Sequence, residues 1–198
     1  MKRNTLTTAV VAGLTGMAGM VSVSNAVNVN PDGLGQVLLY PYYSARGGND
    51  TLISIVNTTE RGKAVKIRFI EAMNSREVLD FNIYMSPFDA WTAVISADGE
   101  GGKMMTTDTT CTVPYFVGNS DNGVGEQSFL DFEFAGDAND GAPEGIERTA
   151  SGYIEVIEMG TMVDRDSDDV GAWVEANTKH TAGVPEDCDS LVEAWTLR

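Results

Sequence analysis

The sequence predicts a mainly β protein built as an antiparallel β-sandwich, with one or two short helices near its C-terminus. Two observations lead there. Short segments alternate between apolar and polar side chains, which is the period of a half-buried strand. Turns rich in Gly, Asn and Pro separate these segments, and no helical pattern lies between the first five. A parallel α/β sheet with its dinucleotide crevice is therefore excluded.

Five strands are expected in the first half of the chain. They cover residues 36–43, 51–57, 64–70, 78–85 and 91–96. Pro41 lies within the first of these. Because proline cannot donate a hydrogen bond to a neighbouring strand, its position predicts an edge strand or a bend.

The clearest alternation lies in residues 64–70. Val65, Ile67 and Phe69 are expected to face the core, while Lys66 and Arg68 face outward. Residues 78–85 repeat this pattern. Their inward side chains are expected to be Leu79, Phe81, Ile83 and Met85.

The second half gives weaker signals. Two further strands are expected at 127–134 and 152–159, and two helices at 170–176 and 185–197. The last helix places Leu191, Val192 and Trp195 on one apolar stripe. The chain ends directly after it, which leaves two interpretations: the helix is a C-terminal cap, or the 198 residues are part of a longer protein.

Composition narrows the class of protein. The 198 residues carry 13 basic and 29 acidic side chains, a net charge of −16, which argues against nucleic acid as a partner. The hydrophobic fraction of 42% is too high for a disordered acidic tail. One acidic globular domain remains as the expectation.

Residues 1–26 read as a secretory signal. Lys2 and Arg3 precede an uncharged run, and Ser24–Asn25–Ala26 supplies small residues for cleavage after Ala26. A retained membrane helix is the alternative, but the run is only weakly apolar. The mature chain, residues 27–198, is then one acidic β-rich domain without a transmembrane segment. We expect a secreted, periplasmic or cell-surface location.

Removal of the signal leaves 11 basic against 29 acidic side chains, a net charge of −18. The excess is uneven. Residues 27–97 carry a net charge of −1, and residues 98–198 carry −17. The first part therefore reads as a packed scaffold and the second as a more solvated, loop-rich face.

Cys111 and Cys188 are the only cysteines. Export favours a disulfide between them, and two unpaired thiols are the alternative. No transition-metal site is expected, because one histidine and two bridged cysteines leave too few ligands.

Calcium is the one candidate cofactor. Asp164, Asp166, Asp168 and Glu175 match positions 1, 3, 5 and 12 of an EF-hand loop. Position 6, where the loop needs glycine, is Asp169, so a true EF-hand is not predicted. A looser calcium site is the hypothesis, and a solvated acidic turn is the simpler interpretation.

Tyr40, Tyr42 and Tyr43 form an aromatic cluster beside Pro41. Exposed, they could stack on sugar rings or contact a protein. Buried, they would be core packing, which the general burial of aromatic residues favours. His180, the single histidine, lies in a polar stretch without a nucleophile motif and is expected in an exposed loop. No catalytic residue is predicted.

Part of the chain resembles a known group. Residues 35–43, 46–52 and 56–58, together with 75–81, 85–87 and 89–92, are similar to uncharacterised exported bacterial surface proteins. Over residues 33–114 the rhythm of strands is similar to immunoglobulin-like sandwiches of bacterial surface assemblies. The resemblance implies export and an immunoglobulin-like fold. It carries no catalytic residues.

The sequence therefore predicts an exported, non-enzymatic protein with a structural, adhesive or matrix role at the cell surface, with calcium as the candidate ion. Its partners would be proteins, polysaccharides or further copies of itself. The alternative is a polysaccharide-binding module or carbohydrate-active enzyme, which would need a carboxylate pair beside exposed tyrosines.

Overall fold

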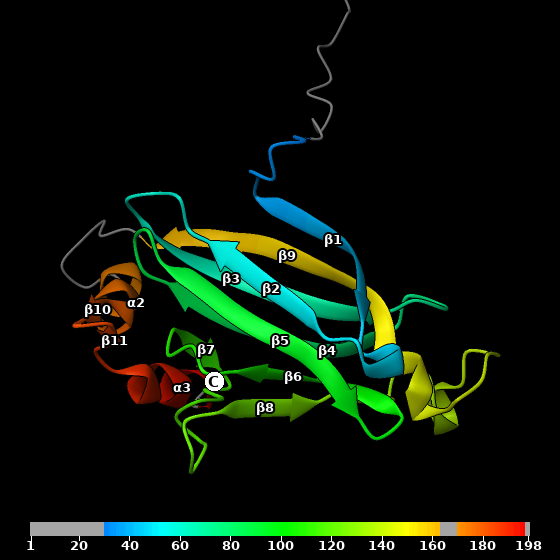
Figure 1. The fold of residues 1–198 in the computed structure, drawn as a ribbon. Coiled ribbons are helices and arrows are strands. Elements are labelled where there is room, and N and C mark those ends of the chain that lie inside the picture. Colours follow the sequence, from blue (N-terminus) through cyan, green and yellow to red (C-terminus); the bar gives the residue numbers. More distant parts are fainter. Residues whose placement is uncertain (1–29, 163–169, 197–198) are drawn as a thin grey trace, which may run out of the picture. The chain divides into compact units, whose positions relative to one another are not determined.

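A computed structural model describes residues 30–162 and 170–196 (Figure 1). The chain divides into two units, Met1–Leu34 and Gly35–Arg198. The helices and strands of the described residues lie in the second unit. The predicted signal, residues 1–26, and the acidic residues Asp164, Asp166 and Asp168 lie outside the described residues.

The protein is mainly β, with antiparallel sheets and two C-terminal helices, as the sequence predicts. A five-stranded sheet has the order β1-β9-β3-β4-β7, and a four-stranded sheet has the order β2-β5-β6-β8. The strands of the first sheet are β1 (Val37–Ser44), β9 (Ser151–Met162), β3 (Gly62–Glu71), β4 (Glu77–Met85) and β7 (Cys111–Val113). Those of the second are β2 (Thr51–Val56), β5 (Ala90–Asp98), β6 (Gly101–Thr106) and β8 (Gly125–Ser128).

The two sheets share one hydrophobic core. The predicted alternation in β3 is confirmed, because Val65, Ile67 and Phe69 are buried. From the other sheet, Ile53 and Trp91 join the same cluster. Burial of apolar surface is the main favourable term in folding, so this shared core holds the two layers together.

The first strand confirms the prediction made from Pro41. β1 is an edge strand of its sheet, and its pairing with β9 is irregular between Tyr40 and Tyr43. A bulge and a proline are common ways to limit pairing at a sheet edge.

Two strands of the large sheets, β6 and β7, were not predicted, and neither were the short β10 (His180–Thr181) and β11 (Val184–Pro185). β6 begins with Gly101 and Gly102, which look like turn residues in the sequence. A Cβ on Gly101 would lie 2.8 Å from Thr149 Oγ1, and one on Gly102 would lie 3.1 Å from the Thr149 carbonyl oxygen. These glycines let the strand approach the short 3-10 helix Ile146–Ala150 closely.

The predicted strand at 127–134 is wrong beyond Ser128. Phe129 donates its N–H to the Gly102 carbonyl, and Leu130 donates to the Val78 carbonyl, so the chain crosses from one sheet to the other. A turn then follows, in which Phe134 donates to the Asp131 carbonyl. The buried Phe129 and Phe134 rings make this segment look like a strand in the sequence.

The C-terminal segment holds α2 (Val170–Thr178) and α3 (Cys188–Thr196). A small ribbon of β10 (His180–Thr181) and β11 (Val184–Pro185) joins them. Its two-residue turn has positive φ at Ala182 and Gly183, as a tight hairpin of this type requires.

The predicted start of the last helix at residue 185 is corrected to Cys188. Pro185 pairs with His180 in the ribbon. Asp187 then caps the helix, accepting hydrogen bonds from Ser190 N at 2.9 Å and from Ser190 Oγ at 2.6 Å. These bonds hold the pKa of Asp187 below its ordinary value.

The disulfide between Cys111 and Cys188 is confirmed, with the two Cα atoms 5.3 Å apart. It links β7, an edge strand of the five-stranded sheet, to the first turn of α3. The helix is therefore attached covalently to the sheet.

A buried ion cluster fixes the opposite region of the fold. Arg148 contacts Glu71 and Asp140, each at 2.9 Å, and all three side chains are at most 2% exposed. Its guanidinium also lies over the Phe134 ring. The cluster joins the end of β3 to the segment before β9.

The folded structure lowers the pKa values of both carboxylates in this cluster. Burial raises the pKa of Glu71, but hydrogen bonds from Arg148 and from the backbone N–H groups of residues 73, 74 and 76 outweigh it and hold that pKa below its ordinary value. Hydrogen bonds from Arg148 hold the pKa of Asp140 well below its ordinary value.

Replacing both cysteines, Cys111→Ser with Cys188→Ser, is expected to lower the free energy of unfolding by roughly 4 kcal/mol, because the bridge closes a loop with a sequence separation of 77 residues. Urea unfolding of the two proteins measures this. Wild-type protein unfolded under reducing conditions should match the variant. A loss below about 1 kcal/mol would show that the bridge constrains the unfolded chain far less than loop closure implies.

Arg148→Met is expected to lower the free energy of unfolding by about 3 kcal/mol at neutral pH, because it leaves the buried Glu71 carboxylate without its cation and leaves Asp140 with Arg76 alone, at 3.5 Å. Both carboxylates have lowered pKa values in the folded state, so their contribution is complete above the ordinary glutamate pKa of 4.5 and is lost as the pH falls below it. Denaturation from pH 7 to pH 3 should show a shallower acid loss in the variant. Arg61→Met, at an exposed arginine, is the control, and equal behaviour of both variants would contradict this role.

Candidate functional site

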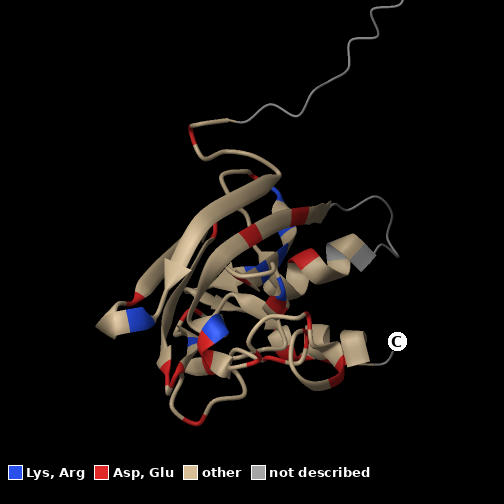
Figure 2. Ribbon diagram, turned by 90° about the vertical axis from the view of Figure 1, so that its right-hand side faces the viewer, with Lys and Arg blue, Asp and Glu red and all other residues tan. Residues whose placement is uncertain are grey.

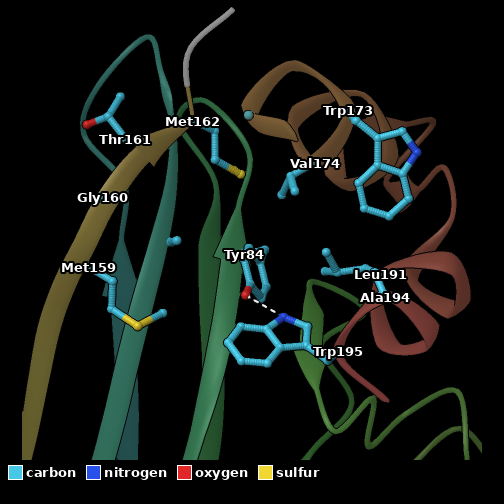
Figure 3. A pocket seen from close by; sticks show the side chains of 12 residues that line it. Tyr84, Met159, Gly160, Thr161, Met162, Trp173, Val174, Leu191, Ala194 and Trp195 are labelled. Atoms are coloured by element: carbon cyan, nitrogen blue, oxygen red, sulfur yellow. Dashed lines mark hydrogen bonds between the residues drawn. The ribbon is translucent and has the colours of Figure 1, made fainter. Parts of the chain in front are cut away.

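A pocket of about 280 Å³ lies between the five-stranded sheet and the two C-terminal helices (Figure 3). The sheet contributes side chains from β3, β4 and β9, and the helices contribute side chains from α2 and α3. Its aromatic and sulfur-containing lining residues are Tyr84, Met159, Met162, Trp173 and Trp195.

The position of Tyr84 follows from strand alternation. Its neighbours Ile83 and Met85 face the shared core, so Tyr84 points to the outer face of the same sheet. There it packs in a second, smaller cluster with Met162, Val174 and Leu191. This cluster forms the floor of the pocket.

A hydrogen bond within the pocket joins a helix to the sheet. The indole N–H of Trp195 donates to the Tyr84 hydroxyl at 2.8 Å, which joins α3 to β4 (Figure 3). Trp195 nevertheless remains 47% exposed, and Trp173 on α2 is 41% exposed. Both rings therefore stay accessible to a ligand at the mouth of the pocket.

Helix α3 is held in this position from two directions. The disulfide at Cys188 attaches its first turn to β7. The ribbon before it is fixed by backbone bonds, since Glu186 donates to the Lys179 carbonyl and Asp187 to the Asn177 carbonyl. The covalent and hydrogen-bonded restraints together place Leu191 and Trp195 opposite the sheet.

The outer face of the five-stranded sheet outside the pocket is ionic. Arg68 contacts both Glu77 and Glu155. Lys66 and Asp80 form a further pair across β3 and β4. Glu158 lies on the other face of β9, where it contacts Lys63 at 2.7 Å beside the core residues Val65 and Val156.

The structure does not bring the three predicted tyrosines together as one platform. Tyr43 is fully buried, and burial, with Glu71 nearby, raises the pKa of its hydroxyl far above its ordinary value. Tyr40 is half-buried and donates to the Ser54 carbonyl of β2 at 2.8 Å. Tyr42 alone is 66% exposed. The irregular pairing of β1 between Tyr40 and Tyr43 makes the three tyrosine side chains point in different directions.

The predicted calcium ligands are only partly visible. Glu175 lies in α2, while its three aspartate partners lie outside the described residues. Within residues 30–162 and 170–196, no group of three or more His, Cys, Asp or Glu side chains is arranged to hold a metal ion. Calcium binding stays a prediction from the sequence.

The expectation for His180 is wrong. Its ring is half-buried in the ribbon, with Nδ1 at 2.8 Å from Ser86 Oγ and 3.8 Å from Asp89 Oδ2. Sequence reasoning missed Ser86 because it lies 94 positions away. In a hydrolytic triad the serine and the acid bind different ring nitrogens, whereas here both face Nδ1. The cluster therefore attaches the ribbon to the turn between β4 and β5.

No protein-family model, curated protein or solved structure matches this chain. In the part of the chain that the structure describes, no helix has the length and apolar character needed to cross a membrane.

Sequence reasoning found the helical half of the pocket but not the pocket itself. The apolar stripe of Leu191 and Trp195 was visible at helical spacing. The alternation of residues 78–85 predicts only a strand that contains Tyr84, and nothing in the sequence indicates that β4 and α3 meet. The cysteine pair was the available signal, because it brings residue 111, beside Tyr84 in the sheet, to the start of α3.

Trp195→Phe is expected to lower the free energy of unfolding by about 1 kcal/mol, because it removes the hydrogen bond to Tyr84 while keeping an aromatic ring. Chemical denaturation measures the change. Trp173→Phe is the matched control, because the indole of Trp173 is similarly exposed and lines the same pocket. A loss in the control equal to that of Trp195→Phe would contradict the assigned role of the bond.

Proposed function

We propose that this is an exported, non-enzymatic protein of the cell surface with a structural, adhesive or matrix role, and that it associates with further copies of itself through the outer face of the four-stranded sheet. The observation that carries the proposal is the difference between the outer faces of the two sheets. One is cross-linked by ion pairs, and the other is largely uncharged over β2 and β5.

The uncharged face follows from strand alternation. Ile53 and Ile55 of β2 are buried, so Leu52, Ser54 and Val56 point outward. Leu52 is 84% exposed, the largest value among the exposed large apolar side chains of the described residues. Exposed apolar surface of this kind marks interaction sites when it is contiguous.

The apolar side chains form a row across the sheet. Leu52 pairs in register with Val94 of β5, and Val94 pairs with Met105 of β6. Charge returns only at the borders, where Asp108 accepts hydrogen bonds from Thr92 and where Lys103 contacts Glu126. We call this surface the Leu52 row. It consists of Leu52, Val94 and Met105.

The lack of charge on the Leu52 row makes it the surface through which two copies of this acidic chain can meet. Acidic residues outnumber basic ones over most of the ribbon, while the strands carry long uncharged stretches (Figure 2). Two chains of net charge −16 repel each other wherever their acidic regions meet. Contact through the Leu52 row keeps the acidic regions of the two copies apart, which lowers that repulsion without abolishing it, and removes apolar surface from water on both copies.

The edge strands β1 and β2 do not offer the same opportunity. On β1, Pro41 and the irregular pairing interrupt the edge, and on β2 the Ser54 carbonyl is already bound by Tyr40. Face-to-face association is therefore favoured over the addition of strands at the edge.

The disulfide supports the proposed location. Structural disulfides form and persist in oxidising compartments, and the predicted signal at residues 1–26 leads to such a compartment. The fold supports a two-layer sandwich, since side chains of both sheets share one core. The immunoglobulin-like assignment stays a prediction, because β1 pairs with β9 rather than with an early strand.

A polysaccharide-binding or carbohydrate-active role is the alternative. Its support is the exposed ring of Tyr42, which could stack on a sugar. Binding of soluble glucans and acidic polysaccharides that is lost in Tyr42→Ala, with no self-association at any concentration, would favour it over the main proposal.

Leu52→Lys is expected to raise the dissociation constant of self-association of the mature chain at least about tenfold, because each copy contributes the new charge to the interface. Sedimentation velocity over a range of protein concentrations measures it. Raising the salt concentration should strengthen association of the wild type by screening its net charge.

The matched control is Phe132→Lys, at a 58% exposed apolar residue outside the strands. It should associate as the wild type does. A wild type that is monomeric at all concentrations and salt levels, or equal weakening by both variants, would refute the proposal. Repeating the series with a calcium chelator tests the calcium-dependent version separately.

A further inference from the structure

The side chains that line the pocket between the sheet and the C-terminal helices determine which kinds of small molecule it can bind. None of the twelve residues that line it, all within the described part of the chain, carries a charged side chain. Two tryptophans, a tyrosine and two methionines supply polarisable surface. Aromatic faces and thioethers favour contact with rings, alkyl groups and cations.

The size of the pocket limits the ligand. A volume of about 280 Å³ lies at the low end of small-molecule sites. It accommodates a single ring or a branched alkyl group. A larger ligand would have to extend past the exposed rings of Trp173 and Trp195 into solvent.

The charges beside the pocket are predominantly negative. Glu175 of α2 and Glu193 of α3 directly neighbour the lining residues Val174 and Ala194 in the sequence. Lys63, the one basic residue of the described chain next to a lining residue, faces the other side of the sheet together with Glu158. Lys63 is already engaged, with its Nζ at 2.7 Å from Glu158 and 2.7 Å from Thr161 Oγ1. An anionic ligand would therefore find no cation in the pocket to bind its charge.

We propose that this pocket is a binding site for a small organic cation, an amine joined to one aromatic ring or short alkyl group. The ring or alkyl part would enter between Tyr84 and Leu191. The ammonium group would remain near the mouth, close to the tryptophan rings and in the field of the neighbouring glutamates. This site is independent of the proposed self-association, which uses the other sheet.

The test is a titration of the mature protein at low salt with three probes that share one ring: phenethylammonium, benzyl alcohol and phenylacetate. Tryptophan fluorescence reports binding, because two of the three tryptophans line the pocket and the third, Trp91, is buried in the core. Phenethylammonium is expected to bind at least about fivefold more tightly than phenylacetate, with benzyl alcohol between them. The preference should shrink as salt is added.

Met159→Lys provides the decisive variant. Met159 is half exposed at the pocket, so a lysine there keeps the fold and places a cation beside the ligand. The preference should reverse in favour of phenylacetate. Met73→Lys, at an exposed methionine outside the pocket, should bind as the wild type does.

Three results would overturn the proposal. They are the absence of a saturable response to all three probes, equal or tighter binding of phenylacetate by the wild type, and a response that persists in the variant Trp173→Phe with Trp195→Phe. The last would place the signal at Trp91. None of these results bears on self-association, so the two proposals fail separately.

Discussion

The Cys111–Cys188 disulfide is the constraint on which the C-terminal helical segment of this structure, from α2 to α3, depends. It attaches the first turn of α3 to β7, the outermost strand of the five-stranded sheet. The helix carries few buried side chains of its own, chiefly Leu191. A short amphipathic helix with so little buried surface is marginal alone. Covalent attachment, the capping bonds of Asp187 and the Trp195–Tyr84 hydrogen bond together place it over the sheet, and the pocket exists only because it stays there.

The two sheets use their outer faces differently, and sequence alternation is the cause. In β3, outward positions are basic and find acidic partners on β4 and β9. In β2, outward positions are uncharged, and Leu52 is left exposed. One core therefore supports three kinds of surface: an ionic sheet face, an aromatic pocket beneath two helices, and an uncharged sheet face. The two proposals are assigned to the last two of these surfaces.

The strands with regular alternation could be predicted because burial on one face imposes a period of two along the chain. Pro41 similarly identified an edge strand, and the predicted export to an oxidising compartment favoured the pairing of the two cysteines. The failures share a cause. The glycines of β6 are needed because Thr149, distant in the sequence, lies against them. The segment after Ser128 crosses from one sheet to the other. His180 contacts Ser86, which is 94 positions away in the sequence. Such contacts depend on which strands pair, and the local sequence does not encode that. The pocket was missed for the same reason.

Hydrogen–deuterium exchange on the oxidised and reduced protein tests most directly whether the disulfide holds the helical layer on the sheet. Reduction is expected to accelerate amide exchange in α2, the ribbon and α3, while β3, β4 and β9 keep the protection of the shared core. Unchanged exchange in α3 after reduction would contradict this expectation, because the helix would then be held without the bridge. Equal acceleration throughout both sheets would also contradict it, because the core would then depend on the same bond.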